Sequence, residues 1–285
     1  MTRPSIGVFD SGVGGLSVLR EIKQRLPHEP LVYFADQTHV PYGSRSLNDV
    51  QALSEGITRF LLEQGCELVV VACNTASAAA LHLLRSNFPT TPFVGMEPAV
   101  KPAAERSETR KVAVLATPAT FQGALFASVV DRFADGVEVV EIVAPGLVEL
   151  IESGQTTSGE IDSALSEALE PAKSQGIDTL VLACTHYSFV VPAIQRILGP
   201  NVIIIDPAPA VARQTERLWE GKDAGANTSE GAGTQSGIST QAGTSARYIT
   251  SGDPGAFRSS MLKLVGEGAN TEPASWVAGT LIATS

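Results

Sequence analysis

One segment decides the predicted fold: Leu68-Val69-Val70-Val71-Ala72-Cys73-Asn74-Thr75-Ala76-Ser77-Ala78-Ala79-Ala80-Leu81. Its first half is a short apolar run rich in β-branched residues, which indicates a buried strand. Its second half is rich in alanine, which favours a helix. Cys73 lies between them and is followed by residue types that cap helices. The segment therefore predicts a cysteine at the carboxyl end of a strand and beside the positive end of a helix. At such a position the pKa of a thiol tends to be lowered, and α/β sheets bind ligands there.

A second segment repeats this pattern in the other half of the chain: Thr179-Leu180-Val181-Leu182-Ala183-Cys184-Thr185-His186-Tyr187. One cysteine at a strand end is a weak signal, because most free cysteines are inert small hydrophobes. Two cysteines in matching contexts, Cys73 and Cys184, favour a shared chemical role.

The repeat extends beyond the cysteines. A glycine-rich turn at Ser11 precedes the first cysteine strand and Glu97-Pro98-Ala99 follows it, whereas Thr117 precedes the second and Asp206-Pro207-Ala208 follows it. Matched order at similar spacing indicates two similar halves, and strands that alternate with helices predict largely parallel sheets. We therefore expect an α/β fold of two similar facing domains, each a largely parallel sheet flanked by helices, related by a pseudo-twofold axis.

The expected domains follow from the repeat. Residues 1–97 with 208–285 form the first domain and residues 98–207 the second, with the active site in the cleft between them. Residues 222–246 are rich in Gly, Ala, Ser and Thr, which predicts a flexible insert. The expected strands are residues 6–9, 31–35, 68–72, 112–118, 139–142, 179–183, 203–205 and 248–250, with a strand and turn over residues 93–100. The expected helices are residues 16–26, 47–64, 74–81, a helix from Thr120, and residues 147–154, 161–175, 190–198 and 257–265.

Composition and charge disfavour nucleic-acid-binding and membrane proteins. The chain has 285 residues and a net charge of -10, which argues against a general nucleic-acid binder. Its three cysteines, an odd number, indicate free thiols and a reducing compartment. The sequence contains neither a leader pattern nor a run of 18 apolar residues, so we expect a cytoplasmic protein that does not enter a membrane. Cys66, which precedes its strand, is expected to be structural.

Two thiols that face one carbon atom from opposite sides can invert it. One thiolate removes a proton and the other thiol delivers a proton to the opposite face, which is racemisation or epimerisation. A carbon acid beside a carboxylate is very weak, so positioned donors must stabilise the developing charge. Polar residues near the two cysteines can serve in this way: Asp10, Ser11, Asn74, Thr75, Thr185 and His186.

Other chemistries find less support. The turn Gly12-Val13-Gly14-Gly15 lacks the spacing of a dinucleotide or P-loop motif. No Cys/His cluster has metal-ligand spacing, so we expect no metal. Every lysine lies outside the motifs, which disfavours pyridoxal phosphate. A thiol hydrolase or redox protein would need one nucleophile with its base, or a C-x-x-C pair.

The chain resembles the glutamate racemases of the cofactor-independent aspartate/glutamate racemase superfamily. The matching pieces span residues 6–254 in the family order. They are Ile6-Gly7-Val8-Phe9-Asp10-Ser11-Gly12-Val13-Gly14-Gly15, Pro41-Tyr42-Gly43, Ala72-Cys73-Asn74-Thr75-Ala76, Glu152-Ser153-Gly154, Ala183-Cys184-Thr185-His186-Tyr187 and Thr250-Ser251-Gly252-Asp253-Pro254. The insert before Arg247 departs from the family pattern.

The resemblance implies a role for each matching residue. Cys73 and Cys184 would be the two acid/base residues, the first acting on the D-enantiomer and the second on the L-enantiomer. Asp10 and His186 would assist the thiols, and Glu152 would orient His186. The substrate would be held by Asp10, Ser11, Tyr42, Gly43, Asn74, Thr75, Thr185 and His186, with Thr117 and Thr120 as weaker candidates.

The same resemblance implies a function. The family makes D-glutamate for peptidoglycan, needs no cofactor and typically forms homodimers. Two alternatives stay open: a racemase of the same superfamily that acts on aspartate or another amino acid, and a binding or regulatory protein that has kept the fold.

Overall fold

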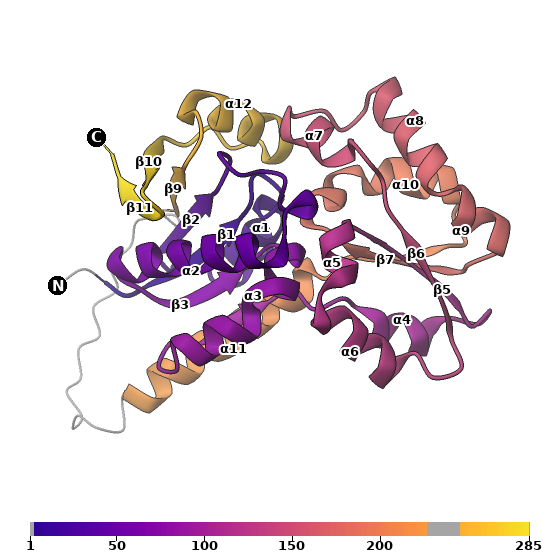
Figure 1. Cartoon of the computed structure of the whole chain (residues 1–285), viewed down its shortest axis with the longest axis horizontal. Coiled ribbons are helices and arrows are strands. Elements are labelled where there is room, and N and C mark those ends of the chain that lie inside the picture. The colour runs from indigo at the N-terminus through magenta and orange to yellow at the C-terminus, as the bar shows by residue number, and fades with distance from the viewer. Residues whose placement is uncertain (1–2, 227–245, 285) are drawn as a thin grey trace.

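A computed structural model describes residues 3–226 and 246–284, which form two sheets lying side by side (Figure 1). The first sheet has the order β11-β10-β9-β2-β1-β3-β4 and the second β6-β5-β7-β8. All neighbouring strands run parallel except β10 and β11. The strands are β1 (Ser5–Asp10), β2 (Leu31–Ala35), β3 (Cys66–Val71), β4 (Phe93–Gly95), β5 (Lys111–Ala116), β6 (Glu138–Ile142), β7 (Thr179–Ala183), β8 (Ile203–Ile205), β9 (Ala246–Thr250), β10 (Thr271–Val277) and β11 (Thr280–Ala283).

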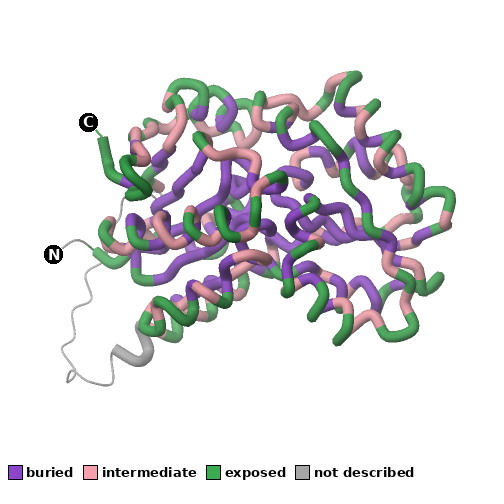
Figure 2. Tube along the Cα trace, in the orientation of Figure 1, coloured by how far each residue is buried: buried purple, intermediate pink, exposed green. Residues whose placement is uncertain are grey.

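Helices cover both faces of each sheet, which encloses the apolar strands (Figure 2). On the first sheet, α1 (Leu16–Arg25), α11 (Ala208–Ala226) and α12 (Pro254–Val265) pack on one face, and α2 (Leu47–Glu63) and α3 (Asn74–Asn87) on the other. The helices of the second sheet are α4 (Val100–Arg106), α5 (Pro118–Gln122), α6 (Ala124–Phe133), α7 (Leu147–Glu152), α8 (Gly159–Ala168), α9 (Glu170–Gln175) and α10 (Val191–Leu198). Two short 3₁₀ turns are η1 (Tyr42–Ser44) and η2 (Thr185–Val190). The predicted α/β class, with two largely parallel sheets flanked by helices, is confirmed.

The two sheets repeat one strand order. In the first sheet β2-β1-β3-β4 are neighbours, and in the second β6-β5-β7-β8 take the same places in the same chain order. Cys73 therefore follows β3 and Cys184 follows β7, and these two strands hold equivalent places in their sheets. The first sheet uses strands from residues 5–95 and 246–283, and the second uses strands from residues 111–205. We propose residues 1–97 with 208–285, and residues 98–207, as the two domains.

Several expected elements differ from those observed. The helix expected over residues 161–175 is two helices, because Pro171 has no N–H group and begins a new first turn in α9. The helix expected from Thr120 is divided at Gly123, where an added Cβ would lie 2.6 Å from the Cβ of Ala78. Of the strand and turn expected over residues 93–100, the strand is Phe93–Gly95, and helix α4 already begins at Val100.

The predicted insert is partly helical. Helix α11 continues to Ala226, and β9 already begins at Ala246. The rest of the predicted insert, residues 227–245, lies outside the described residues. Within the part of the chain that the structure describes, no helix is both long and apolar enough to cross a bilayer.

The C-terminal hairpin, β10 with β11, was not predicted. Its inward residues are Ala274, Trp276 and Leu281, which pack with helix α2 in the core of the first domain. Gly56 of α2 leaves space for the Trp276 ring, because an added Cβ at Gly56 would lie 2.7 Å from two of its ring carbons. The hairpin extends the first sheet beyond β9, and its two strands together with β9 are the three strands by which the first sheet exceeds the second.

This packing can be tested by adding one methyl group. Alanine in a helix interior is normally more stable than glycine by about 1 kcal/mol, but at Gly56 the methyl would displace Trp276, at a typical cost of about 1–3 kcal/mol. We expect Gly56→Ala to lower the free energy of unfolding, measured with urea. Gly221→Ala in α11, whose added methyl meets no described atom within 4 Å, should raise it. A rise for both variants would contradict the packing of Trp276.

Candidate active site

The two cysteines lie at equivalent strand ends and line one cavity. Cys73 follows β3 and caps the N-terminus of α3, and Cys184 follows β7 and precedes η2. Both side chains are buried. The cavity holds about 10 Å³, which is the space of about one water molecule. The remaining lining residues are Ser11, Pro41, Tyr42, Gly43, Asn74, Thr75, Thr117, Val148, Thr185 and His186.

Two of the predicted site residues stand behind this lining. The Asp10 carboxylate accepts hydrogen bonds from Thr185 Oγ1 at 3.3 Å and from the Gly12 N–H group at 3.1 Å. The Glu152 carboxylate accepts from the Val13 N–H group at 2.8 Å. Asp10 and Glu152 therefore contact the wall residues Thr185 and His186 from behind. All the other predicted site residues except Thr120 line the cavity themselves.

The side chain of Asn74 has the chemistry of a ligand site. It is 2% exposed, and among the described residues neither its amide nitrogen nor its amide oxygen has a hydrogen-bond partner. Buried polar atoms are nearly always paired, so an unpaired amide in a cavity wall is available to a polar ligand.

Three threonine hydroxyls join the two domains beside Asn74. Thr75 Oγ1 lies 2.9 Å from Thr117 Oγ1 and 3.2 Å from Thr120 Oγ1, and these two lie 2.9 Å apart. Thr117 reaches the cavity, but Thr120 does not line it. The structure thus places Thr120 as a partner of the other two hydroxyls.

His186 and Glu152 form a buried pair. Nε2 of His186 lies 2.5 Å from Glu152 Oε1, and Nδ1 lies 3.7 Å from the Cys184 sulfur. Burial opposes charge on His186, but its contacts with Cys184 and Glu152 outweigh burial and hold its pKa well above the usual 6.5. Burial likewise works to raise the pKa of Glu152, but His186 and the Val13 N–H group lower it. An imidazolium at this place can stabilise negative charge on the sulfur of Cys184.

Cys73 differs from the expectation for a strand end. The Ala76 N–H group donates to its sulfur at 3.5 Å, as a helix N-terminus should. Burial and the nearby Asp10 carboxylate have the larger effect, and they raise the pKa of Cys73 well above its ordinary value. Burial also raises the pKa of Asp10, against the charge of His186. The prediction of a lowered thiol pKa is therefore wrong for Cys73, which is held as the protonated thiol.

The glycine-rich turn after β1 makes room for the other domain. An added Cβ at Gly12 would collide with the Glu152 carboxylate, and one at Gly14 would lie 2.5 Å from His186 Nδ1. Glycines in a turn of this kind often let a ligand approach the backbone. In the structure they let Glu152 and His186 approach it.

Two residues of the site were missed by sequence reasoning. Asp36 accepts a hydrogen bond from the Tyr42 hydroxyl at 2.6 Å, and Gln37 Nε2 donates to Glu152 Oε2 at 3.3 Å. Both follow strand β2, which pairs with β1. The available signal was a carboxylate at the carboxyl end of a strand, where ligand sites of parallel sheets gather.

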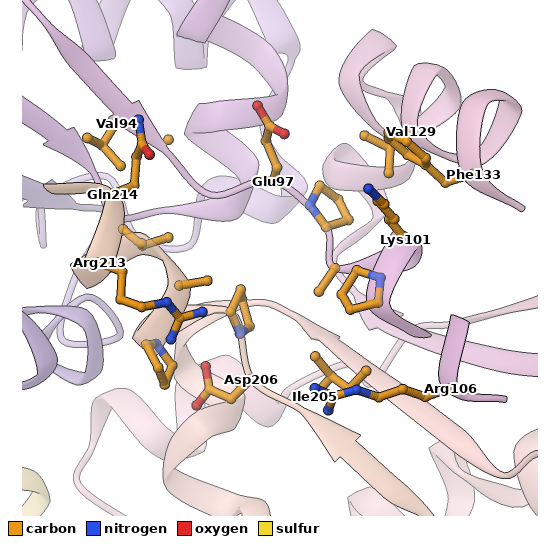
Figure 3. A pocket seen from close by; sticks show the side chains of 18 of the residues that line it. Val94, Glu97, Lys101, Arg106, Val129, Phe133, Ile205, Asp206, Arg213 and Gln214 are labelled. Carbon is orange, nitrogen blue, oxygen red and sulfur yellow. The ribbon is translucent and has the colours of Figure 1, made fainter. Parts of the chain in front are cut away.

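A larger hollow of about 650 Å³ lies where the chain passes between the domains. Its wall comes from the link between β4 and α4 and from the link between β8 and α11, and Figure 3 shows Glu97, Lys101, Asp206 and Arg213 around it. None of the predicted site residues lines it, so the paired thiols assign the chemistry to the small cavity.

Fold and site together define an α/β protein with paired thiols in an inter-domain cavity. Residues 6–215 match the family described as Asp/Glu/Hydantoin racemase. The glutamate racemase of Roseiflexus sp. (strain RS-1) is 51% identical over 213 residues, which are 75% of this chain and 78% of that protein. Among solved structures, a glutamate racemase isoform of Bacillus anthracis has a TM-score of 0.83 at 27% identity and covers 98% of this chain and 100% of its own.

A further solved relative is the Escherichia coli glutamate racemase in complex with L-glutamate and the activator UDP-MurNAc-ala. It has a TM-score of 0.78 at 29% identity and covers 100% of both chains. The chain belongs to the Asp/Glu/hydantoin racemase family. The predicted resemblance to the glutamate racemases and the predicted enzyme class, a racemase, are confirmed.

The pairing of Glu152 with His186 predicts a pH effect. In Glu152→Gln the imidazolium loses its counter-charge, so the pKa of His186 should fall and the ring should lose its proton at lower pH. NMR titration of the His186 imidazole measures this pKa directly. The alkaline limb of the pH profile of racemase activity should move to lower pH together with the pKa. Glu149→Gln, which removes an exposed carboxylate from the same helix α7, should leave the titration unchanged. An unshifted His186 in Glu152→Gln would refute the pairing.

Proposed function

We propose that the protein interconverts L-glutamate and D-glutamate, without a cofactor, by proton transfer at the α-carbon between Cys73 and Cys184. The observation that carries this proposal is that both thiols line one cavity from equivalent strand ends of two similar sheets. Inversion needs an acid and a base on opposite faces of the carbon, and two related halves that face each other supply one each.

The surroundings of the thiols suit them to different steps. For L-glutamate, Cys184 as thiolate takes the α-proton while the His186 imidazolium stabilises its charge. The Cys73 thiol then gives its proton to the opposite face, which yields D-glutamate and leaves Cys73 as the thiolate. In the reverse direction the roles exchange. The high pKa of Cys73 supports its role as the proton donor in the first direction.

The cavity wall supports a substrate with carboxylates. It offers the hydroxyls of Ser11, Thr75 and Thr185 and the unpaired amide of Asn74. Donors of this kind bind carboxylates and stabilise charge that develops beside them. Tyr42 and Gly43 complete the wall, and Asp10 acts through Thr185.

The present cavity is too small for glutamate, which needs more than the space of one water molecule. Substrate entry must therefore widen the gap between the domains, and the hydroxyl contacts of Thr75 with Thr117 and Thr120 cross that gap. Closing again would exclude water from the carbanion.

The printed names of the relatives favour glutamate over aspartate, and the Escherichia coli relative was solved with L-glutamate. We further propose that the D-glutamate serves peptidoglycan synthesis, that the protein acts in the cytoplasm, and that it forms a homodimer. It would use no nucleic acid and no membrane as a partner.

A direct assay tests the reaction. Purified protein given L-glutamate in deuterium oxide, with nothing added, should form D-glutamate that carries deuterium at the α-carbon, followed by circular dichroism and mass spectrometry. L-aspartate should react much more slowly. No D-glutamate at any pH between about 7 and 9, the range around a thiol titration, would refute the proposal, and faster turnover of aspartate would favour the alternative substrate.

Replacing each thiol separates the two bases. Cys73→Ser and Cys184→Ser should each nearly abolish racemisation, because a hydroxyl is a far weaker acid and base than a thiol. A β-chlorinated glutamate analogue requires proton removal from one face only, so Cys184→Ser should still act on its D-form and Cys73→Ser on its L-form. Cys66→Ser should keep full activity. Cys66 is a buried thiol with a pKa of about 11, and its hydrogen-bond partner is Ser5. Equal loss on both enantiomers in both variants would contradict opposed bases.

A further inference from the structure

Asp36 is a buried carboxylate with four donors around it. It is fully buried and accepts hydrogen bonds from the Tyr42 hydroxyl at 2.6 Å and from Trp276 Nε1 at 2.8 Å. The Ser251 hydroxyl donates at 2.7 Å, and His39 Nδ1 lies 3.0 Å away. These four donors come from the turn after β2, the segment after β9 and the C-terminal hairpin.

A carboxylate has about four acceptor sites, so these donors use its full capacity. A buried charge is costly unless it is hydrogen-bonded. Removal of one donor therefore leaves the charge undersatisfied, and the carboxylate turns toward other partners. The remaining three donors then shift with the carboxylate, because all four share this one group.

Trp276 is held in place by its packing against two other residues. Its ring lies over Gly56 of helix α2, and the His39 ring meets it edge-on with the ring centres 5.5 Å apart. This packing aims the indole N–H group at Asp36 from outside the cavity. Trp276 itself does not line the cavity, so its effect on the site passes through the carboxylate.

Tyr42 is the donor that reaches the site. It is 1% exposed, and burial together with Asp36 raises its pKa well above the ordinary value, so the hydroxyl stays protonated and donates. The Tyr42 hydroxyl is already bonded to Asp36, so it does not point to a substrate. The contribution of Tyr42 to the cavity is that this bond fixes the position of turn η1. In that turn Gly43 approaches Thr117 of the second domain so closely that an added Cβ would lie 2.6 Å from the threonine Cβ.

We propose that Trp276 is a positioning residue of the active site: through the Asp36 carboxylate, its indole N–H group sets the place of Tyr42 and of the turn that forms one wall of the substrate cavity. The C-terminal hairpin is thereby part of the substrate-binding apparatus. The assignment of glutamate as the ligand rests on the proposed function, whereas the linkage from Trp276 to Tyr42 rests on geometry alone.

The kinetic test removes one N–H group. Trp276→Phe keeps a ring over Gly56 and should raise the KM for glutamate about tenfold, the value of one hydrogen bond to a charged group, with a smaller change in kcat. Trp219→Phe is the matched control, because its buried indole N–H group has no partner among the described residues; it should leave KM and kcat unchanged. Tyr42→Phe should also raise KM. The double variant Tyr42→Phe with Trp276→Phe should be no worse than the more affected single variant, because both act through Asp36.

A second measurement does not depend on turnover. In the Trp219→Phe protein Trp276 is the one remaining tryptophan of the chain's two, and the ¹H–¹⁵N signal of its indole reports its bond to Asp36. Adding Tyr42→Phe should move this signal, whereas Tyr248→Phe, whose hydroxyl donates to Glu267, should not.

The outcomes separate the two proposals. If the unmodified protein does not turn over glutamate but Tyr42→Phe moves the indole signal, the linkage stands and the proposed substrate falls. If the protein is active and Trp276→Phe leaves KM unchanged, or if Tyr42→Phe leaves the indole signal in place, the positioning role of Trp276 is overturned.

Discussion

The carboxylate of Glu152 joins the two halves of the cavity. One oxygen atom, Oε1, accepts from the Val13 N–H group of the first domain and contacts Nε2 of His186 in the second. The orientation of His186 beside Cys184 and the distance between the sheets therefore depend on the same group. The glycines of the turn after β1 are needed for this approach, since a side chain at Gly12 or Gly14 would occupy the place of Glu152 or His186. A buried pair of this kind is stable only when its hydrogen bonds are complete.

Neighbouring groups make two equivalent strand ends chemically unequal. Cys184 lies beside the cationic His186, whereas burial and, after it, the Asp10 carboxylate raise the pKa of the Cys73 thiol. His186 lies where it can stabilise negative charge on the Cys184 sulfur, whereas Cys73 is held as the protonated thiol. The proposed reaction needs a base and an acid at the same carbon at the same time, and this asymmetry supports one role for each thiol. The fold repeats the strands, and the residues around them make the two thiols different.

The C-terminal part of the chain adds to this frame from outside the repeat. Strands β9 and β10 extend the first sheet, and Thr250, Ser251 and Trp276 all reach the segment after β2. That segment carries Gln37 toward Glu152 and Tyr42 toward the cavity. Both halves of the site are therefore supported by residues that follow the predicted insert in the chain.

The sequence by itself determined the α/β class, the repeat, and the pairing of Cys73 with Cys184, because apolar periodicity and a cysteine after each strand are local patterns. It also indicated Asp10, His186 and Glu152, through the family resemblance of their motifs. Only the tertiary structure decided that Glu152 reaches across to Val13, that Asp36 holds Tyr42, and that Trp276 rests on Gly56. The pKa of Cys73 was predicted in the wrong direction for the same reason. A local pattern contains the helix N-terminus, but burial and the charge of Asp10 arise only when distant segments pack together.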